Sequence, residues 1–138
     1  MEGVLSLTRV DHVLNMAGSF TQDFNCWGAT MFIEQAKNRL EWVENPEISE
    51  WLQNDFHPIK KEDLEIGDIL ALFDTDKKKE RMMLVHTAVY VGDKLFVHKM
   101  GQNRATKDNL KGVLREYAYC GNSFVFLRKG KLDEQVKE

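Results

Sequence analysis

The sequence predicts an α+β fold, with helices in the first half of the chain and an antiparallel sheet in the second. Over residues 4–16 and again over 26–42, apolar side chains recur three and four positions apart, which is the spacing of one helix face. From residue 69 onward, short apolar runs separated by Gly-Asp pairs replace this pattern, as is typical of strands and turns. The 138 residues fit a single domain, with a core over about 14–128 and a charged tail, 129–138, that we expect to fray.

The first half of the chain should contain a short helix, a polar loop and then a longer helix. Residues 4–16 have apolar positions at helical spacing and should cover the core. Small and polar residues dominate 16–25 and predict a loop. The next helix should begin at Cys26 and run to about Trp42, before Asn45-Pro46 breaks it.

A change of period follows in the middle of the chain. Residues 48–54 favour one more short helix, and 56–61, which contains Pro58, favours a loop. The apolar run 69–73 follows a Gly-Asp pair and indicates a buried strand, and 74–81 should be a charged, hairpin-like connection.

The last third of the chain should complete the sheet. A strand over 83–91 and another over 95–98 are joined by Gly92-Asp93, a tight-turn pair. Residues 107–117 favour a short helix or an irregular crossing segment, and 123–128 favours the last strand.

The position of Cys26, between the polar loop and the predicted helix, makes it a candidate nucleophile. A thiol at a helix N-terminus lies at the positive end of the helix dipole, which should lower its pKa and favour the reactive thiolate. The alternative is a buried cysteine that only fills space under a helix.

Two of the four histidines can be related to each other by the predicted hairpin. His86 and His98 lie on either side of its turn, so antiparallel pairing should place them opposite or one pair apart, facing the same side. Cys26, His86 and His98 could then act as nucleophile, general base and orienting residue, with the Cys26 backbone N–H as an oxyanion donor. His12 and His57 have no arguable partners and are expected to be structural or surface residues.

One cysteine and two histidines could instead hold zinc with an open position for water. No C-x-x-C or H-x-x-x-H spacing supports a metal site, so we expect neither a metal nor any other cofactor.

Composition limits the classes of partner. A net charge of −3, a pI near 5.8 and the lack of a basic stripe argue against nucleic acid. The longest mainly apolar run, 82–91, is too short to cross a bilayer, and the N-terminus has no signal-peptide pattern. We expect synthesis in the cytoplasm, with export or phage delivery left open. Cys26 and Cys120 do not make a disulfide framework, and the role of Cys120 stays open.

Three blocks, in this order, resemble the NlpC-like cell-wall cysteine peptidases. Residues 24–28 (Phe-Asn-Cys-Trp-Gly) resemble the nucleophile block of that family, and 65–73 (Glu-Ile-Gly-Asp-Ile-Leu-Ala-Leu-Phe) resemble its Gly-Asp strand. The stretch 86–98, from His86 to His98, resembles its two-histidine hairpin. Residues 117–128 are similar to its closing strand, which ends in an arginine.

This resemblance, over about residues 14–128, implies a papain-like fold in which the nucleophilic cysteine starts a helix packed on an antiparallel sheet. It also implies a Cys-His-His triad that cleaves an amide bond, most typically in a peptidoglycan stem peptide. The chain has Asn25 and Trp27 where the family has Asp and Ser, and no tyrosine in 14–18. These departures concern substrate specificity. We take Asn25, Trp27 and Asn15 as candidates for the oxyanion hole or the substrate groove.

Two other functions stay open for a chain of this kind. An acyl-enzyme on Cys26, the intermediate that amide cleavage would use, could instead serve acyl transfer or deamidation on a protein or lipid. A catalytically silent papain-like module could bind a partner near Trp27 and Trp51. CHAP amidases share the Cys-then-His order, whereas LRAT-like acyltransferases usually place His before Cys. The scissile bond, natural substrate, host and oligomeric state are not predicted.

Overall fold

The computed structural model describes residues 2–15, 24–76, 81–100, 105–117 and 123–130. The predicted loop over 16–25, the frayed tail and Cys120 therefore lie largely or wholly outside the described residues. Within them, the helical elements are α1 (Glu2–Asn15), α2 (Cys26–Ile33), α3 (Asn45–Asp55), the 3-10 turn η2 (Lys61–Asp63) and α4 (Leu110–Glu116).

All strands of the sheet pair antiparallel, as the sequence predicts, in the order β1-β6-β2-β3-β4-β5. The order is not a simple meander, because the last strand inserts between the first two. The strands are β1 (Phe56–Ile59), β2 (Ile69–Asp76), β3 (Arg81–Gly92), β4 (Leu95–Lys99), β5 (Ala105–Asn109) and β6 (Ser123–Lys129).

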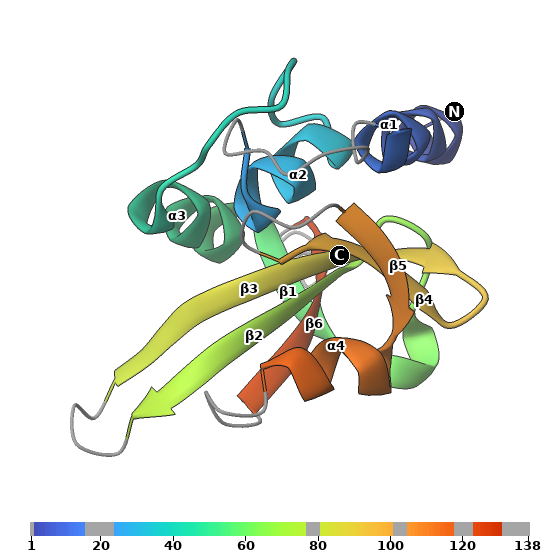
Figure 1. The fold of residues 1–138 in the computed structure, drawn as a ribbon. Helices are drawn as coiled ribbons and strands as arrows, with labels where there is room; N and C mark the ends of the chain where they lie inside the picture. Colours follow the sequence, from blue (N-terminus) through green and yellow to red (C-terminus); the bar gives the residue numbers. More distant parts are fainter. Residues whose placement is uncertain (1, 16–23, 77–80, 101–104, 118–122, 131–138) are drawn as a thin grey trace, which may run out of the picture.

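Helices cover both faces of this sheet, with α1, α2 and α3 on one side and α4 on the other (Figure 1). The apolar run that begins β2 shows why both faces need cover. Ile69 and Ala71 pack in the cluster shared with α2 and α3, whereas Leu70 and Leu72 pack in the cluster shared with α4. Because both faces of the strand are buried, its sequence is continuously apolar rather than alternating.

The second helix is much shorter than predicted. It was expected over 26–42, but α2 ends at Ile33, and Gln35 takes a left-handed backbone conformation with φ 67° that a helix cannot continue. The guanidinium of Arg9, on α1, donates to the carbonyls of Phe32 (2.7 Å) and Lys37 (2.8 Å) and so satisfies groups on both sides of this turn.

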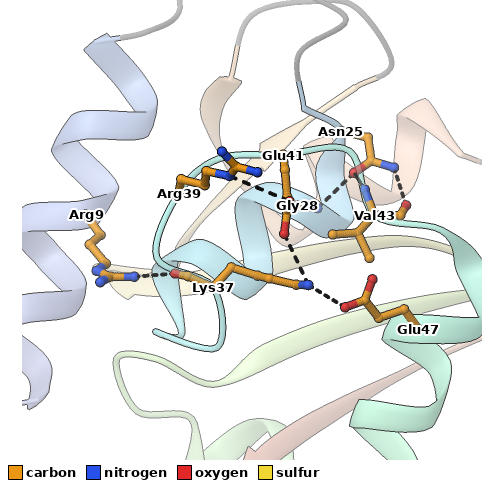
Figure 2. Close-up of polar contacts among 8 residues, drawn as sticks. All are labelled: Arg9, Asn25, Gly28, Lys37, Arg39, Glu41, Val43 and Glu47. Atoms are coloured by element: carbon orange, nitrogen blue, oxygen red, sulfur yellow. Dashed lines mark hydrogen bonds and ion pairs between the residues drawn. The ribbon is translucent and has the colours of Figure 1, made fainter.

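The segment 34–44 runs back along α2 instead of extending it (Figure 2). Its backbone passes so close to Gly28 that a Cβ there would overlap the carbonyl of Glu41. Lys37 holds the segment from the other side, since its Nζ forms ion pairs with Glu41 (3.1 Å) and with Glu47 of α3. The apolar residues of this stretch still pack inward, although the chain is not helical: Leu40 packs against the core.

The sequence prediction missed two strands. Residues 56–61 were predicted as a loop, yet β1 pairs with β6 there, and Pro58 is tolerated because β1 is an edge strand. The stretch 107–117 was expected to be one helix or crossing segment, but its start belongs to β5 and only Leu110–Glu116 is helical. Neither strand has the apolar run that signals a strand on its own.

Asp68 joins the start of β2 to β6 by a buried ion pair. Its carboxylate accepts hydrogen bonds from Arg128 Nε (3.0 Å) and Nη2 (2.8 Å), and from the backbone N–H of Glu65 (2.7 Å). Asp68 is 4% exposed, whereas the Arg128 side chain is 30% exposed. The Gly-Asp block and the closing arginine recognised in the sequence therefore meet in a structural contact.

We expect Asp68→Asn to lower the free energy of unfolding by about 2–3 kcal/mol, because it removes a charged partner from three hydrogen bonds in a buried position. Urea denaturation would measure the change. The matched control is Glu65→Gln, which removes the ion pair between Glu65 and Arg128. That pair is 3.5 Å long, and the Glu65 side chain is 73% exposed. This control should change stability by no more than about 0.5 kcal/mol, and equal effects of the two substitutions would contradict the assignment.

Candidate active site

Asn25 fixes the point at which the helix of Cys26 begins (Figure 2). Its Oδ1 accepts from the backbone N–H of Gly28 (2.9 Å) and of Val43 (3.1 Å), and its Nδ2 donates to the carbonyl of Val43 (2.8 Å). The first bond is a standard N-cap, and the other two tie the cap to the returning segment 34–44. Cys26 is therefore held at the first turn of α2 from two directions.

These bonds occupy both lone pairs of the Asn25 side-chain oxygen and one of its amide hydrogens, and the residue is buried. We assign Asn25 to holding the helix start, and these contacts give no support to its predicted oxyanion role. The sequence signal for the cap was present, because asparagine is among the preferred N-cap residues.

The Cys26 thiol has a raised pKa, which corrects the expectation that the helix start would lower it. Burial raises the pKa from 9.0 to about 11. Hydrogen bonds from the backbone N–H groups of Thr87, Trp27 and Cys26, together with the charge of Lys99, act in the opposite direction but are outweighed. With a pKa about four units above neutral, only about one thiol in 10⁴ is a thiolate at pH 7. A base is therefore needed if Cys26 is to act as a nucleophile.

His86 and His98 lie side by side on β3 and β4. The strand register pairs Val89 with Val97, and continuing it by one residue pairs Ala88 with His98. His86 lies two residues from Ala88, so it is a diagonal neighbour of His98 on the same face of the sheet. A hydrogen bond of 2.8 Å joins His86 Nε2 to His98 Nδ1, and both rings are buried. The hairpin pattern of the sequence thus places the two imidazoles in contact.

Two further residues complete the surroundings of these rings, and the sequence reasoning missed both. Tyr117 stacks on His86, with ring centroids 4.2 Å apart and an interplanar angle of 21°. Asp108, on β5, lies with its Oδ2 2.9 Å from His98 Nε2. Finding Asp108 required knowing that β5 pairs with β4, and no local pattern signals that strand.

His86 is neutral at physiological pH. Burial, and then the charge of His98, lower its pKa well below the usual 6.5. Its Nδ1 is buried and makes no hydrogen bond with any atom of the described residues, the Cys26 thiol included. The thiol nevertheless lies against the backbone N–H of Thr87, the residue next to His86. Within the described residues, His86 Nδ1 thus has no hydrogen-bond partner, and the Cys26 thiol accepts a hydrogen bond from the backbone of the next residue, Thr87.

The other predicted site residues are placed as follows. Trp27 is partly buried against the cluster of α3, and its indole N–H has no hydrogen-bond partner among the described residues. Asn15 is the exposed last residue of α1, and its place in a groove stays a prediction. His12 is exposed, whereas His57 is buried with its Nδ1 2.7 Å from the carbonyl of Gly130, a structural contact.

Two further properties concern metal binding and membrane crossing in the described part of the chain. No group of three or more His, Cys, Asp or Glu side chains there is arranged to hold one metal ion. None of its helices is both long enough and apolar enough to cross a membrane.

Two solved structures resemble this chain in fold. NlpC1 from Trichomonas vaginalis superposes with a TM-score of 0.55 at 17% identity, over 91% of this chain and 43% of that one. NlpC2 from the same organism gives a TM-score of 0.55 at 16% identity, over 94% of this chain and 47% of that one. This chain thus spans less than half of either solved chain. Neither family models nor curated proteins show a match. The chain therefore has the papain-like fold of NlpC proteins. This conclusion rests on the superposition and is consistent with the order of helices and strands and with the cysteine at a helix start.

Proposed function

We propose that this protein is a thiol hydrolase that cleaves an amide bond through an acyl-enzyme on Cys26, with a peptidoglycan stem peptide as its substrate. One observation carries the proposal: the thiol accepts a hydrogen bond from the backbone N–H of Thr87, the residue that follows the buried His86, whose Nδ1 has no hydrogen-bond partner among the described residues. The substrate class rests on the three sequence blocks that resemble cell-wall peptidases, and on the NlpC-like fold.

In the acylation step, His86 Nδ1 takes the thiol proton while Sγ attacks the carbonyl carbon of the scissile amide. The backbone N–H of Cys26 donates to the oxygen that becomes negative. When the tetrahedral intermediate collapses, the C–N bond breaks and His86 returns the proton to the departing amine. The acyl group is then a thioester on Cys26.

In the deacylation step, water attacks the thioester carbonyl and His86 Nδ1 accepts a proton from that water. The C–S bond breaks, a carboxylic acid leaves, and the proton returns to Sγ, so that the enzyme is regenerated without any cofactor. Because both resting groups are neutral, the proton moves as the sulfur attacks rather than beforehand.

The experiment is to trap the acyl-enzyme. The protein is mixed with a synthetic stem peptide, quenched in acid during turnover, digested and mapped by mass spectrometry. We expect the digested segment that contains Cys26 to gain the mass of the N-terminal fragment of the stem peptide minus one water. The segment with Cys120 serves as an internal control and should stay unmodified.

Two results would contradict the proposal. One is release of new amines without any adduct on Cys26, and the other is cleavage that persists after iodoacetamide has alkylated that residue. Analysis of the released acyl product separates hydrolysis from acyl transfer, because hydrolysis yields a free carboxylic acid and transfer yields a new amide or ester.

A further inference from the structure

The hydrogen-bond chain that starts at His86 does not end at His98. Beyond that ring lies Asp108, the last residue of β5 but one, whose carboxylate is 2.9 Å from His98 Nε2. The His98 side chain is fully buried, whereas the Asp108 side chain is 40% exposed. The chain therefore runs from a buried imidazole nitrogen to a carboxylate that reaches water.

The local packing holds this carboxylate in place. In the β4–β5 pairing, Asp108 stands opposite Phe96 and Thr106 stands opposite His98, so the carboxylate reaches His98 diagonally across the pair. On its other side is Gly112, where a Cβ would come within 3.2 Å of Asp108 Oδ1. The carboxylate fits between the imidazole and the first turn of α4.

When both rings are neutral, the chemistry of the three groups allows one assignment of protons. A carboxylate only accepts hydrogen bonds, so His98 Nε2, which lies 2.9 Å from Asp108 Oδ2, must carry the proton and donate. The Nδ1 of a neutral His98 is then an acceptor, and His86 Nε2 must be the donor in the bond between the rings. It follows that Nδ1 of a neutral His86 carries a lone pair, which is the form a general base needs.

The same assignment stays valid after His86 has accepted a proton. The imidazolium would still donate from Nε2 to His98, and His98 would still donate to Asp108, so no group has to turn during the reaction. A negative charge at the far end of the chain also favours the positive charge that forms on His86.

We infer that Asp108 is a positioning residue that, through His98, keeps His86 in the tautomer whose Nδ1 can accept the thiol proton. The inference rests on the proposed function, since it assigns Asp108 a task in the activation of Cys26. Asp108 contacts His98 Nε2, and its effect on His86 Nδ1 passes through two rings.

The test is Asp108→Asn, which keeps the shape of the side chain but removes its charge. The asparagine can offer an N–H to His98, and that would reverse both ring tautomers and place a proton on His86 Nδ1. We expect kcat on a stem peptide to fall about 10- to 100-fold with little change in KM; a fully buried aspartate in the equivalent role of a serine-protease triad is worth about 10⁴. The matched control is Asp93→Asn, which removes an exposed carboxylate from the turn of the same hairpin and should leave kcat unchanged.

A second measurement needs no substrate. The rate at which iodoacetamide alkylates Cys26 at pH 7, followed by peptide mapping, should fall in Asp108→Asn and not in Asp93→Asn. If the wild type cleaves no peptide but this rate falls, the proposed hydrolysis is wrong while the role of Asp108 in thiol activation holds. If the wild type cleaves peptide, and Asp108→Asn matches it in both kcat and alkylation rate, the inference about Asp108 is overturned and the proposed function stands.

Discussion

Cys26→Ala is expected to reduce amide cleavage to the uncatalysed background, a loss in kcat/KM of at least about 10⁴-fold. The loss should be this large because, in the proposed mechanism, the thiol forms the covalent bond, and Cys26 is the free cysteine of the described residues. Release of new amines from a stem peptide would measure it.

The fold should survive this substitution. Alanine is the best helix former, and the position lies at the first residue of α2, where the Asn25 cap is untouched. Cys120→Ala is the matched control and should retain wild-type activity, because we assign the chemistry to Cys26 alone. Comparable cleavage by Cys26→Ala and wild type would remove the basis for the mechanism.

The second large effect is expected for His86→Phe, which should lower kcat/KM about 10³- to 10⁴-fold. Phenylalanine retains a flat ring that can stack on Tyr117, but it has no nitrogen to accept the thiol proton. Since burial raises the Cys26 pKa to about 11, the variant, which lacks the base, should be alkylated rapidly only at strongly alkaline pH. An alkylation profile identical to that of the wild type would show that His86 is not the base.

His12→Phe is the control for this substitution, since His12 is exposed on α1 and lies outside the site. It should leave both the cleavage rate and the alkylation profile unchanged.

His86→Phe should also change how stability depends on pH. The pKa of His86 is lowered by folding, so in the wild type the unfolded chain takes up a proton below about pH 6.5 that the folded chain does not. Stability is therefore lost as pH falls below 6.5, by up to about 1.4 kcal/mol per pH unit. The variant lacks this contribution, and urea denaturation between pH 7 and pH 5 should show its stability falling less steeply.

The fold class was predictable because its signals are local. The apolar run that begins β2 and the hairpin turn near Gly92 need no distant contact to be predicted, and the antiparallel sheet they predict is confirmed. The turn itself is formed by Asp93 and Lys94, one residue later than predicted, because Gly92 still pairs with Leu95. The same turn places His86 and His98 on one face of a hairpin, where the structure joins them by a hydrogen bond. Strand period and turn geometry together set which side chains meet.

Other features depended on contacts between distant parts of the chain. The apolar spacing over 26–42 could serve a long helix or a helix followed by a packed extended segment. Arg9 on α1 and the close approach of Glu41 to Gly28 favour the second arrangement. Edge strand β1 was missed for a similar reason, because only its pairing with β6 makes it a strand.

By itself, the sequence determined that this is an α+β protein with a cysteine at a helix start and two histidines on one hairpin. Only the tertiary structure decided the electrostatics of those groups. Burial reverses the expected shift of the Cys26 pKa, because the loss of solvent outweighs the hydrogen bonds at the helix start. The partnership of His98 with Asp108 likewise depends on the β4–β5 pairing. Desolvation and long-range pairing are properties of the folded chain, and no local pattern of residues encodes their magnitude.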